Sequence, residues 1–303
     1  MIPFSLSAQA WLAPKGEGTV SISYQRTFSP YHLDLHGTRF DKGSITLHSM
    51  TVDTDYSLTN KLALRVALPY MFGKYTGTVG HSFPVDDGAY HSTFQNFTAD
   101  LRYNVSQKPV VFTPFVRVVL PSHGYEQLAH AAVGRDVREY HVGINLGRRL
   151  DPILPKAFIQ AQYSYAFVQR ILDISPNRSE VQAQFGYFLT PRLSLLGLVQ
   201  WFHTYRGFDV DFNLPNAGLD HEEFLHHDQL GKIRLLDAGV GASFALSSKT
   251  EMFASWGRSV IGANGHYHTS ILSLAISRTF GTKYAEEKNP LVTLPQDVPQ
   301  RVQ

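Results

Sequence analysis

The chain has 303 residues, of which 43% are hydrophobic and 13% aromatic. Its 27 Lys and Arg residues and 25 Asp and Glu residues give a net charge of only +2, so it lacks the basic face that nucleic-acid binding requires. We therefore expect no nucleic-acid partner. The sequence contains no cysteine, which excludes disulfides and thiolate metal sites and is compatible with export through an oxidising compartment.

The first residues are typical of the end of an export signal. An apolar run over residues 2–6 leads into Ala8-Gln9-Ala10, the small-x-small pattern that precedes signal-peptide cleavage. We interpret residues 1–10 as the remnant of a signal peptide. An ordinary apolar N-terminus is the alternative interpretation.

About twelve runs of roughly ten residues alternate apolar with small or polar side chains. In residues 61–72, Leu64 and Val66 share one face and Arg65 takes the other, because successive side chains of a strand point to opposite sides. None of the runs is long enough to cross a bilayer as a helix. In lipid the backbone polar groups must be satisfied internally, so spanning strands must close on themselves. The pattern predicts an all-β fold, a transmembrane antiparallel β-barrel of about 12 strands over residues 11–280.

Charged residues recur on the face that alternates with the apolar one. Leu101 is expected on the outer face between Asp100 and Arg102, and Leu274 and Ile276 repeat the pattern near the end of the chain. The charged residues expected to line the lumen are Asp53, Asp55, Arg65, Asp100, Arg102, Arg117 and Asp237. A proton relay is conceivable, but charges inside barrels usually pair and fill space, which favours a structural ladder. In an open lumen the arginines would favour anions.

Connector lengths indicate the orientation. Short connectors fall at 58–61, 106–109, 151–155, 189–192 and 246–249, and they alternate with long ones at 29–43, 74–92, 122–137, 169–178, 205–230 and 258–268. In outer-membrane barrels the short turns face the periplasm and the long loops face outwards. Both termini are therefore expected to be periplasmic. Residues 281–303, which are proline-containing and aperiodic, are expected to form a disordered periplasmic tail.

Two segments resemble a known family. Residues 56–70 read YSLTNKLALRVALPY and residues 119–124 read VLPSHG. Both are similar to segments of the outer-membrane channel family named for the meta-pathway of phenol degradation. The resemblance is strongest over residues 44–125 and lies at turns and strand ends, so it bears on fold more than on substrate. It implies a barrel that passes small hydrophobic or aromatic compounds.

Histidine is the unusual residue of this chain. Most of the 14 histidines fall in the expected long loops, among them His32 and His36. Imidazole binds zinc and copper, and neighbouring carboxylates could complete or orient a site. The candidate metal ligands are His81, His91, His123, His130, His226, His227, His266 and His268. Residues 221–227 approach the zinc-protease motif, but the later histidines come at i+5 and i+6 instead of i+4. Plainly solvated loop histidines are the alternative.

The function that these patterns favour is a passive outer-membrane channel, not an enzyme, with outer-membrane lipid and small solutes as partners and no cofactor unless zinc or copper binds the loops. A metal-binding surface barrel, a closed structural barrel and a lipid-modifying enzyme are the alternatives. For the enzyme, Asn264, His266, His268 and Ser270 lie close in sequence but lack the His-x-Ser order expected on one strand. The sequence leaves open the oligomeric state and whether the lumen is open or plugged.

Overall fold

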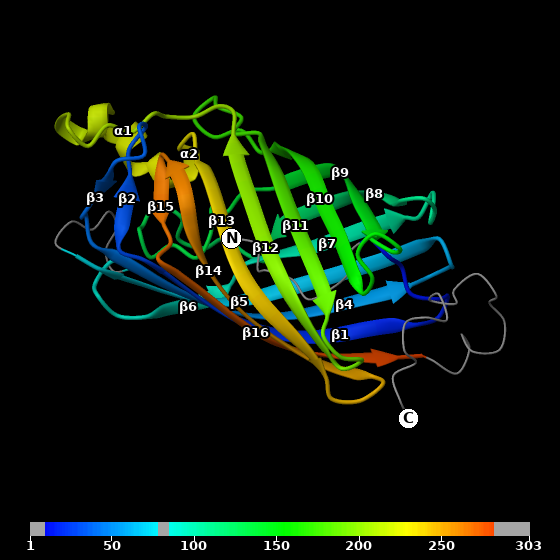
Figure 1. Cartoon of the computed structure of the whole chain (residues 1–303). Coiled ribbons are helices and arrows are strands. Elements are labelled where there is room, and N and C mark those ends of the chain that lie inside the picture. Colours follow the sequence, from blue (N-terminus) through cyan, green and yellow to red (C-terminus); the bar gives the residue numbers. More distant parts are fainter. Residues whose placement is uncertain (1–9, 78–84, 282–303) are drawn as a thin grey trace.

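The computed structural model describes residues 10–77 and 85–281. Within these residues the main sheet runs in the order β4-β1-β16-β14-β13-β12-β11-β10-β9-β8-β7-β5, and β5 pairs with β4 to close it. All of these pairings are antiparallel, and Figure 1 shows the resulting barrel. The twelve-stranded barrel predicted from the alternation is thereby confirmed.

The wall strands are β1 (Gly18–Ser29), β4 (Ser44–Ser57), β5 (Leu62–Thr76), β7 (Asn96–Tyr103), β8 (Val111–Pro121), β9 (Glu139–Arg149), β10 (Ala157–Val168), β11 (Arg178–Phe188), β12 (Leu193–Thr204), β13 (Arg234–Ala245), β14 (Thr250–Ala263) and β16 (Ser270–Phe280). The short strand β6 (His91–Phe94) pairs with β5 and extends the wall beyond the start of β7.

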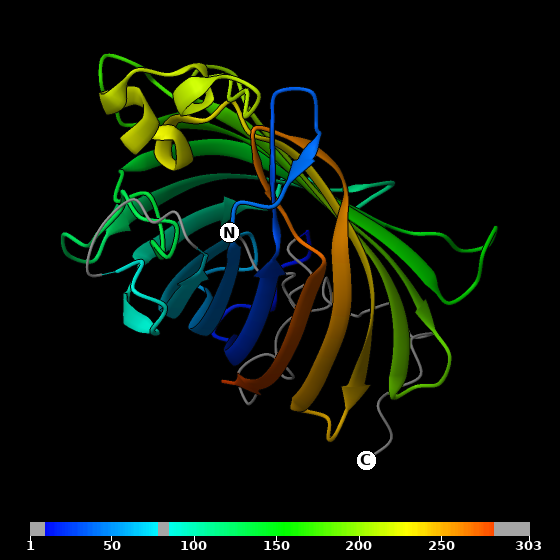
Figure 2. The same cartoon turned by 90° about the vertical axis from the view of Figure 1, so that its left-hand side faces the viewer.

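Smaller elements gather at the end of the barrel that carries the long connectors. They are a sheet of β2 (Tyr31–Leu33), β3 (Arg39–Phe40) and β15 (Gly265–Tyr267), the 3-10 helix η1 (Pro215–Gly218), and the helices α1 (His221–Leu225) and α2 (His227–Leu230). Figures 1 and 2 show them grouped at this end. Among the residues described, none of the helices is both long and apolar enough to span a membrane.

The register decides which side chains face the lumen. Arg65 on β5 stands opposite Asp55 on β4 and Asp100 on β7, so all three lie on the same face of the sheet. That face is the inner one, because Asp100 is 1% exposed whereas the next residue, Leu101, is 42% exposed. Apolar side chains therefore cover the outside of the wall, and polar ones line the lumen.

A segment before β1 lies inside the barrel. Thr113 on β8 donates a hydrogen bond from Oγ1 to the carbonyl of Ala10 at 2.7 Å, and Trp11 meets Phe158 edge to face at 6.2 Å. Gly147 makes this possible, since a Cβ at that position would come within 2.7 Å of Ala10 Cβ. Residues 1–9 of the predicted signal remnant lie outside the described residues, as does the predicted tail after Gly281.

The two ends of the barrel differ as expected, with one exception. The five short connectors join β4 to β5, β7 to β8, β9 to β10, β11 to β12 and β13 to β14. The predicted long loop at 258–268 is wrong, because β14 continues to Ala263 and β15 follows after a single residue. Asn264 makes that reversal with φ at +52°, a conformation that Asn tolerates better than most residues. The wall extends further at this end than the alternation suggested.

Candidate functional site

A ladder of ion pairs lines one side of the lumen. Arg117 on β8 donates two hydrogen bonds to Asp100 on β7, at 2.7 and 2.9 Å. Arg65 lies between two carboxylates, with Nε 2.6 Å from Asp53 Oδ2 and Nη1 3.6 Å from Asp100 Oδ2. The side chains of Arg117 and Asp100 are only 5% and 2% exposed. Buried ion pairs of this kind fix neighbouring strands relative to one another.

The ladder continues through one further predicted pair and then through residues that the sequence patterns did not single out. Arg102 pairs with Asp55, as the predicted lumen set implies. Further round the wall, Arg178 on β11 donates to Glu139 Oε1 on β9 at 2.7 Å and to Glu180 Oε1 at 2.7 Å. Glu139 and Arg178 border expected loops, so the alternation carried no signal for them. Glu180 stands two residues beyond Arg178 and could have been found by extending the strand backwards.

Asp237, the last member of the predicted lumen set, lies apart from the ladder. Its Oδ1 accepts a hydrogen bond from Ser259 Oγ at 2.7 Å, and its Oδ2 lies 3.1 Å from Nδ1 of His268. All three residues are buried. His268, a predicted metal ligand, is therefore engaged with the barrel wall.

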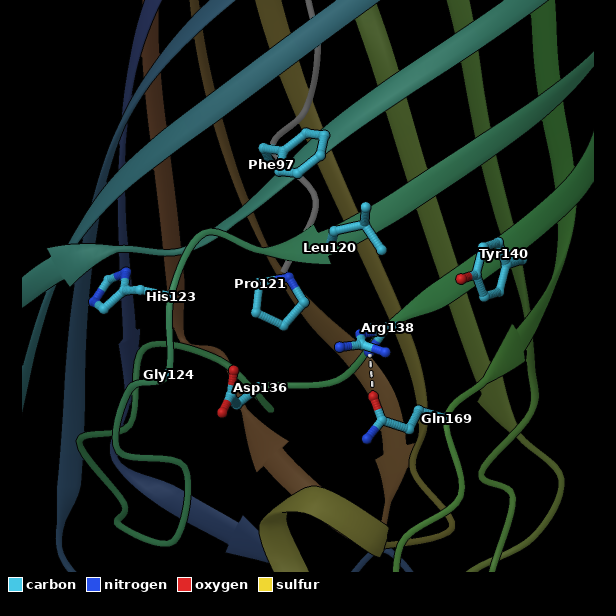
Figure 3. A pocket seen from close by; sticks show the side chains of 9 residues that line it. All are labelled: Phe97, Leu120, Pro121, His123, Gly124, Asp136, Arg138, Tyr140 and Gln169. Atoms are coloured by element: carbon cyan, nitrogen blue, oxygen red, sulfur yellow. Dashed lines mark hydrogen bonds between the residues drawn. The ribbon is translucent and has the colours of Figure 1, made fainter.

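A cavity of about 660 Å³ lies at the outer rim of the barrel, between the ends of β7, β8 and β9 (Figure 3). Part of the lining comes from side chains on the outward face of the wall, namely Phe97, Leu120 and Tyr140. Phe97 is paired with Leu120, and Tyr140 is paired with Val118, so these positions share one face of the sheet. Polar side chains complete the lining, namely His123, Asp136, Arg138 and Gln169, together with Pro121 and Gly124. The cavity thus presents aromatic and charged groups to the same space.

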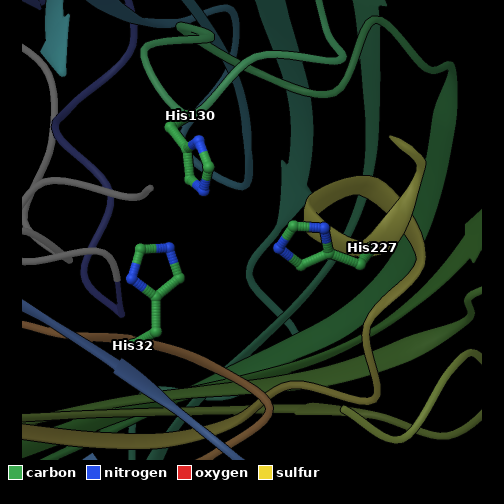
Figure 4. A group of neighbouring side chains, drawn as sticks. All are labelled: His32, His130 and His227. Carbon is green, nitrogen blue, oxygen red and sulfur yellow. The ribbon is translucent and has the colours of Figure 1, made fainter. Parts of the chain in front are cut away.

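Three histidines from separate loops meet at the end of the barrel opposite the short turns. His32 comes from β2, His130 from the connector after β8, and His227 from the first position of α2. One ring nitrogen from each lies within 4.8 Å of the others, and all three residues are buried. Figure 4 shows the rings pointing toward a common space. A fourth imidazole, that of His266, lies 4.4 Å from the His32 ring, because β15 pairs with β2 in this register.

Hydrogen-bond partners on the Nδ1 side orient two of these rings. His130 places Nδ1 3.3 Å from Asp86 Oδ2, and the same carboxylate accepts from the backbone amides of His130 and Ala131. His227 places Nδ1 2.7 Å from the carbonyl oxygen of Phe224. A carbonyl only accepts, so Nδ1 of His227 carries a proton. Its Nε2 lies 3.4 Å from Asp228 Oδ1. The contact with Asp86 likewise favours a proton on Nδ1 of His130.

His32 stands out for its surroundings. It is 3% exposed, and among the residues described neither of its ring nitrogens has a hydrogen-bond partner. Burial, reinforced by the neighbouring His266 ring, lowers the pKa of His32 to about 2. Burial likewise lowers the pKa of His266 to about 4, although the Asp228 carboxylate acts in the opposite direction. Both rings are therefore neutral near pH 7.

The other predicted metal ligands do not join this cluster. His91 Nε2 lies 2.9 Å from Asp87 Oδ1, and His123 Nε2 lies 2.8 Å from Thr93 Oγ1. Both contacts are exposed to solvent. His226 meets Gln229 at 2.7 Å. His81 lies outside the described residues. The structure brings together His130 and His227, with His266 beside them, and adds His32, which was not among the candidates.

The residues considered for an enzyme are engaged elsewhere. His266 places Nε2 2.7 Å from Asp228 Oδ1, and Asn264 donates to Asp209 at 3.0 Å. His268 contacts Asp237, as described above. Within the described part of the chain, the serine nearest to that pair, Ser259, donates to the carboxylate instead of to the imidazole. A nucleophilic triad needs the imidazole between the hydroxyl and the carboxylate, so this arrangement does not supply one.

Comparison with solved structures supports the fold. The COG4313 outer membrane channel from Pseudomonas putida F1 matches with a TM-score of 0.67 at 16% identity, over 90% of this chain and 99% of that one. The toluene transporter TodX from P. putida matches more loosely, with a TM-score of 0.46 at 9% identity, over 89% of this chain and 91% of that one. No family model matches the sequence. No curated protein matches it either.

Proposed function

We propose that this chain is a passive channel of a bacterial outer membrane and that small solutes, hydrophobic or aromatic ones among them, cross through it. The observation that carries the proposal is a closed barrel that is apolar outside and polar inside. The similar fold of a protein named as an outer membrane channel, and the family resemblance of residues 56–70, support it. The proposed role involves no catalysis.

In the proposed orientation the short turns face the periplasm and the long connectors face outwards. The rim cavity then lies on the external side. Its Phe97 and Tyr140 rings suit an aromatic solute, and Arg138 suits a carboxylate carried by that solute. A solute bound there would lie at the edge of the membrane, beside the barrel end.

Ion passage should be only weakly selective. The arginines of the ladder are matched by Asp53, Asp55, Asp100, Glu139 and Glu180, so the wall presents little net charge to a passing ion. Reversal potentials in a planar bilayer under a salt gradient would measure this. A strongly anion- or cation-selective current would contradict the balanced ladder while leaving the channel in place.

The direct test of the proposal is conductance together with solute flux. Purified protein in planar bilayers should give discrete current steps, and vesicles that contain it should swell in benzoate faster than in a sugar of similar size. Tyr140→Ala should slow benzoate entry and leave ion current unchanged. Val142→Ala is the matched control, since it removes an outward side chain of the same strand outside the cavity. Absence of both current and swelling in the parent protein would overturn the proposal.

A further inference from the structure

We propose that His32, His130 and His227 bind one divalent ion of a late first-row transition metal, for which zinc is the probe, at the end of the barrel that carries the long connectors. These three residues are not among those that line the rim cavity, and this inference does not rest on the proposed function. Imidazole nitrogen suits zinc, copper and nickel, whereas magnesium and calcium prefer oxygen ligands. The donor set therefore selects the class of metal.

The spacing of the three rings is close to what a metal needs. Their candidate ligand atoms lie within 4.8 Å of one another. Tetrahedral zinc with Zn–N bonds of about 2.0–2.1 Å sets its ligand atoms about 3.3 Å apart. Side-chain rotations that move each nitrogen by about 1 Å would close that difference. Three protein ligands leave one coordination position for water or another group, as in many zinc sites.

The partners of two rings match the outer contacts of metal-bound histidines. Such histidines commonly donate their second ring nitrogen to a carboxylate or a backbone carbonyl, which fixes the tautomer and aims the lone pair at the metal. His130 has Asp86 in that role, at 3.3 Å, and His227 has the carbonyl oxygen of Phe224, at 2.7 Å. Asp86 is itself fixed by two backbone amides, one of them that of Ala131.

His32 supplies an independent observation that points to a ligand. A buried polar group without a hydrogen-bond partner is rare, and leaving one unsatisfied costs about 1–3 kcal/mol. Both ring nitrogens of His32 are in that condition among the residues described. If one of these two nitrogens coordinated a metal, that nitrogen would no longer lack a partner. A solvated loop histidine, by contrast, would be exposed, as His36 in the same loop is.

The surroundings favour a single defined site. Tyr75 stacks on His130 with ring centroids 4.5 Å apart, and Phe224 stacks on His227 at 5.3 Å. Phe212 meets His32 edge to face at 5.8 Å. These aromatic rings restrict the imidazoles and exclude water, which strengthens electrostatic interactions inside the site. A bound ion would tie together β2, the connector after β8, and α2.

The test is zinc binding by the full chain, purified without a polyhistidine tag and stripped with a chelator. Calorimetric titration in detergent should show one equivalent bound, and metal analysis after dialysis should recover the same ratio. His32→Ala and His227→Ala should each weaken binding at least tenfold. Asp86→Asn should weaken it by about 10- to 100-fold, the usual effect of removing an outer partner.

Matched controls separate this site from the other loop histidines. His36→Ala shares the loop of His32, His226→Ala is adjacent to His227, and His123→Ala shares the connector of His130. All three should retain one equivalent with unchanged affinity. Heat-modifiable gel mobility would verify that each variant is a folded barrel. If the controls lose as much affinity as the cluster variants, the proposal is wrong.

A measurement on the unaltered protein keeps the proposal testable if the variants misfold. Cobalt added to the stripped chain should produce the intense visible absorption of four-coordinate cobalt, saturating at one equivalent and abolished by zinc. A weak octahedral spectrum, or saturation at several equivalents, would overturn the single three-histidine site.

Discussion

The ion-pair ladder and the histidine cluster are both buried polar assemblies, but only the ladder sets opposite charges against one another. In the ladder, each arginine lies against at least one carboxylate, as Arg117 does against Asp100 on the neighbouring strand. The cluster gathers like groups, and His32 lacks a hydrogen-bond partner within the described residues. Charge that is matched within the wall indicates a structural role, whereas buried ligating groups without opposite charges indicate a site for a ligand.

The largest expected effect comes from breaking the ladder at its most buried pair. Arg117→Ala should lower the free energy of unfolding by about 3–5 kcal/mol, because it leaves the Asp100 carboxylate buried without its main partner. Urea unfolding of the refolded barrel in lipid vesicles would measure this. The double variant Asp100→Asn with Arg117→Met should recover most of the loss. A single-variant effect below about 1 kcal/mol would contradict a structural ladder.

The second effect tests why the ladder must face inwards. Leu274, near the middle of β16, is 46% exposed on the outer face. Leu274→Arg should lower the free energy of unfolding by about 2–4 kcal/mol, since an arginine facing lipid has no carboxylate beside it. Leu274→Ala is the control for lost apolar area. Equal effects of the two substitutions in the same vesicle assay would argue that this face does not meet lipid.

The third effect should have the opposite sign. His32→Leu in the metal-free protein removes the unsatisfied nitrogens and should stabilise the local structure by up to about 1–3 kcal/mol. Hydrogen exchange at the amides of β2 and β15 should become slower, whereas zinc binding should be lost. Faster exchange in the metal-free variant would mean that His32 stabilises the loops without a metal.

The smallest effect is expected for an exposed ion pair, which serves as the comparison for the buried pairs of the ladder. Arg170 and Asp173 form a pair at 3.5 Å, but their side chains are 67% and 95% exposed. Arg170→Ala should change the free energy of unfolding by no more than about 0.5 kcal/mol, because solvent and salt screen exposed pairs. The same urea titration measures it. If Arg170→Ala lowered the free energy of unfolding as much as Arg117→Ala does, burial could not be the reason why the ladder pairs stabilise the barrel.

The ladder was largely predictable because strand geometry is periodic. Arg65, Asp100 and Arg102 lie in runs whose apolar neighbours mark the outer face, and the short turns set the register that brings strands together. Glu139 and Arg178 were missed because they lie at the ends of strands, where the apolar alternation stops before the hydrogen bonding does.

The histidine cluster was predictable only as a possibility. Closure of a barrel brings its loops into one ring, so convergence of some histidines could be expected. Which ones converge depends on tertiary contacts between residues distant in sequence, such as the pairing of β2 with β15. His32 was overlooked for that reason. His268, which follows β15, lies instead against the barrel wall, where its Nδ1 contacts Asp237 Oδ2.

The pairing of β1 with β16 joins the first and last strands of the described barrel wall. A hydrogen bond from Ser273 Oγ to Gln25 Oε1 joins residues 248 positions apart. Until β16 arrives, β1 and β14 would each expose an unpaired edge, which lipid does not tolerate, and contacts so distant in sequence form slowly. Trp11 contacts Phe158 on β10 inside the wall that this seam completes. Completion of the β1–β16 seam therefore removes both unpaired edges and encloses the segment that contains Trp11.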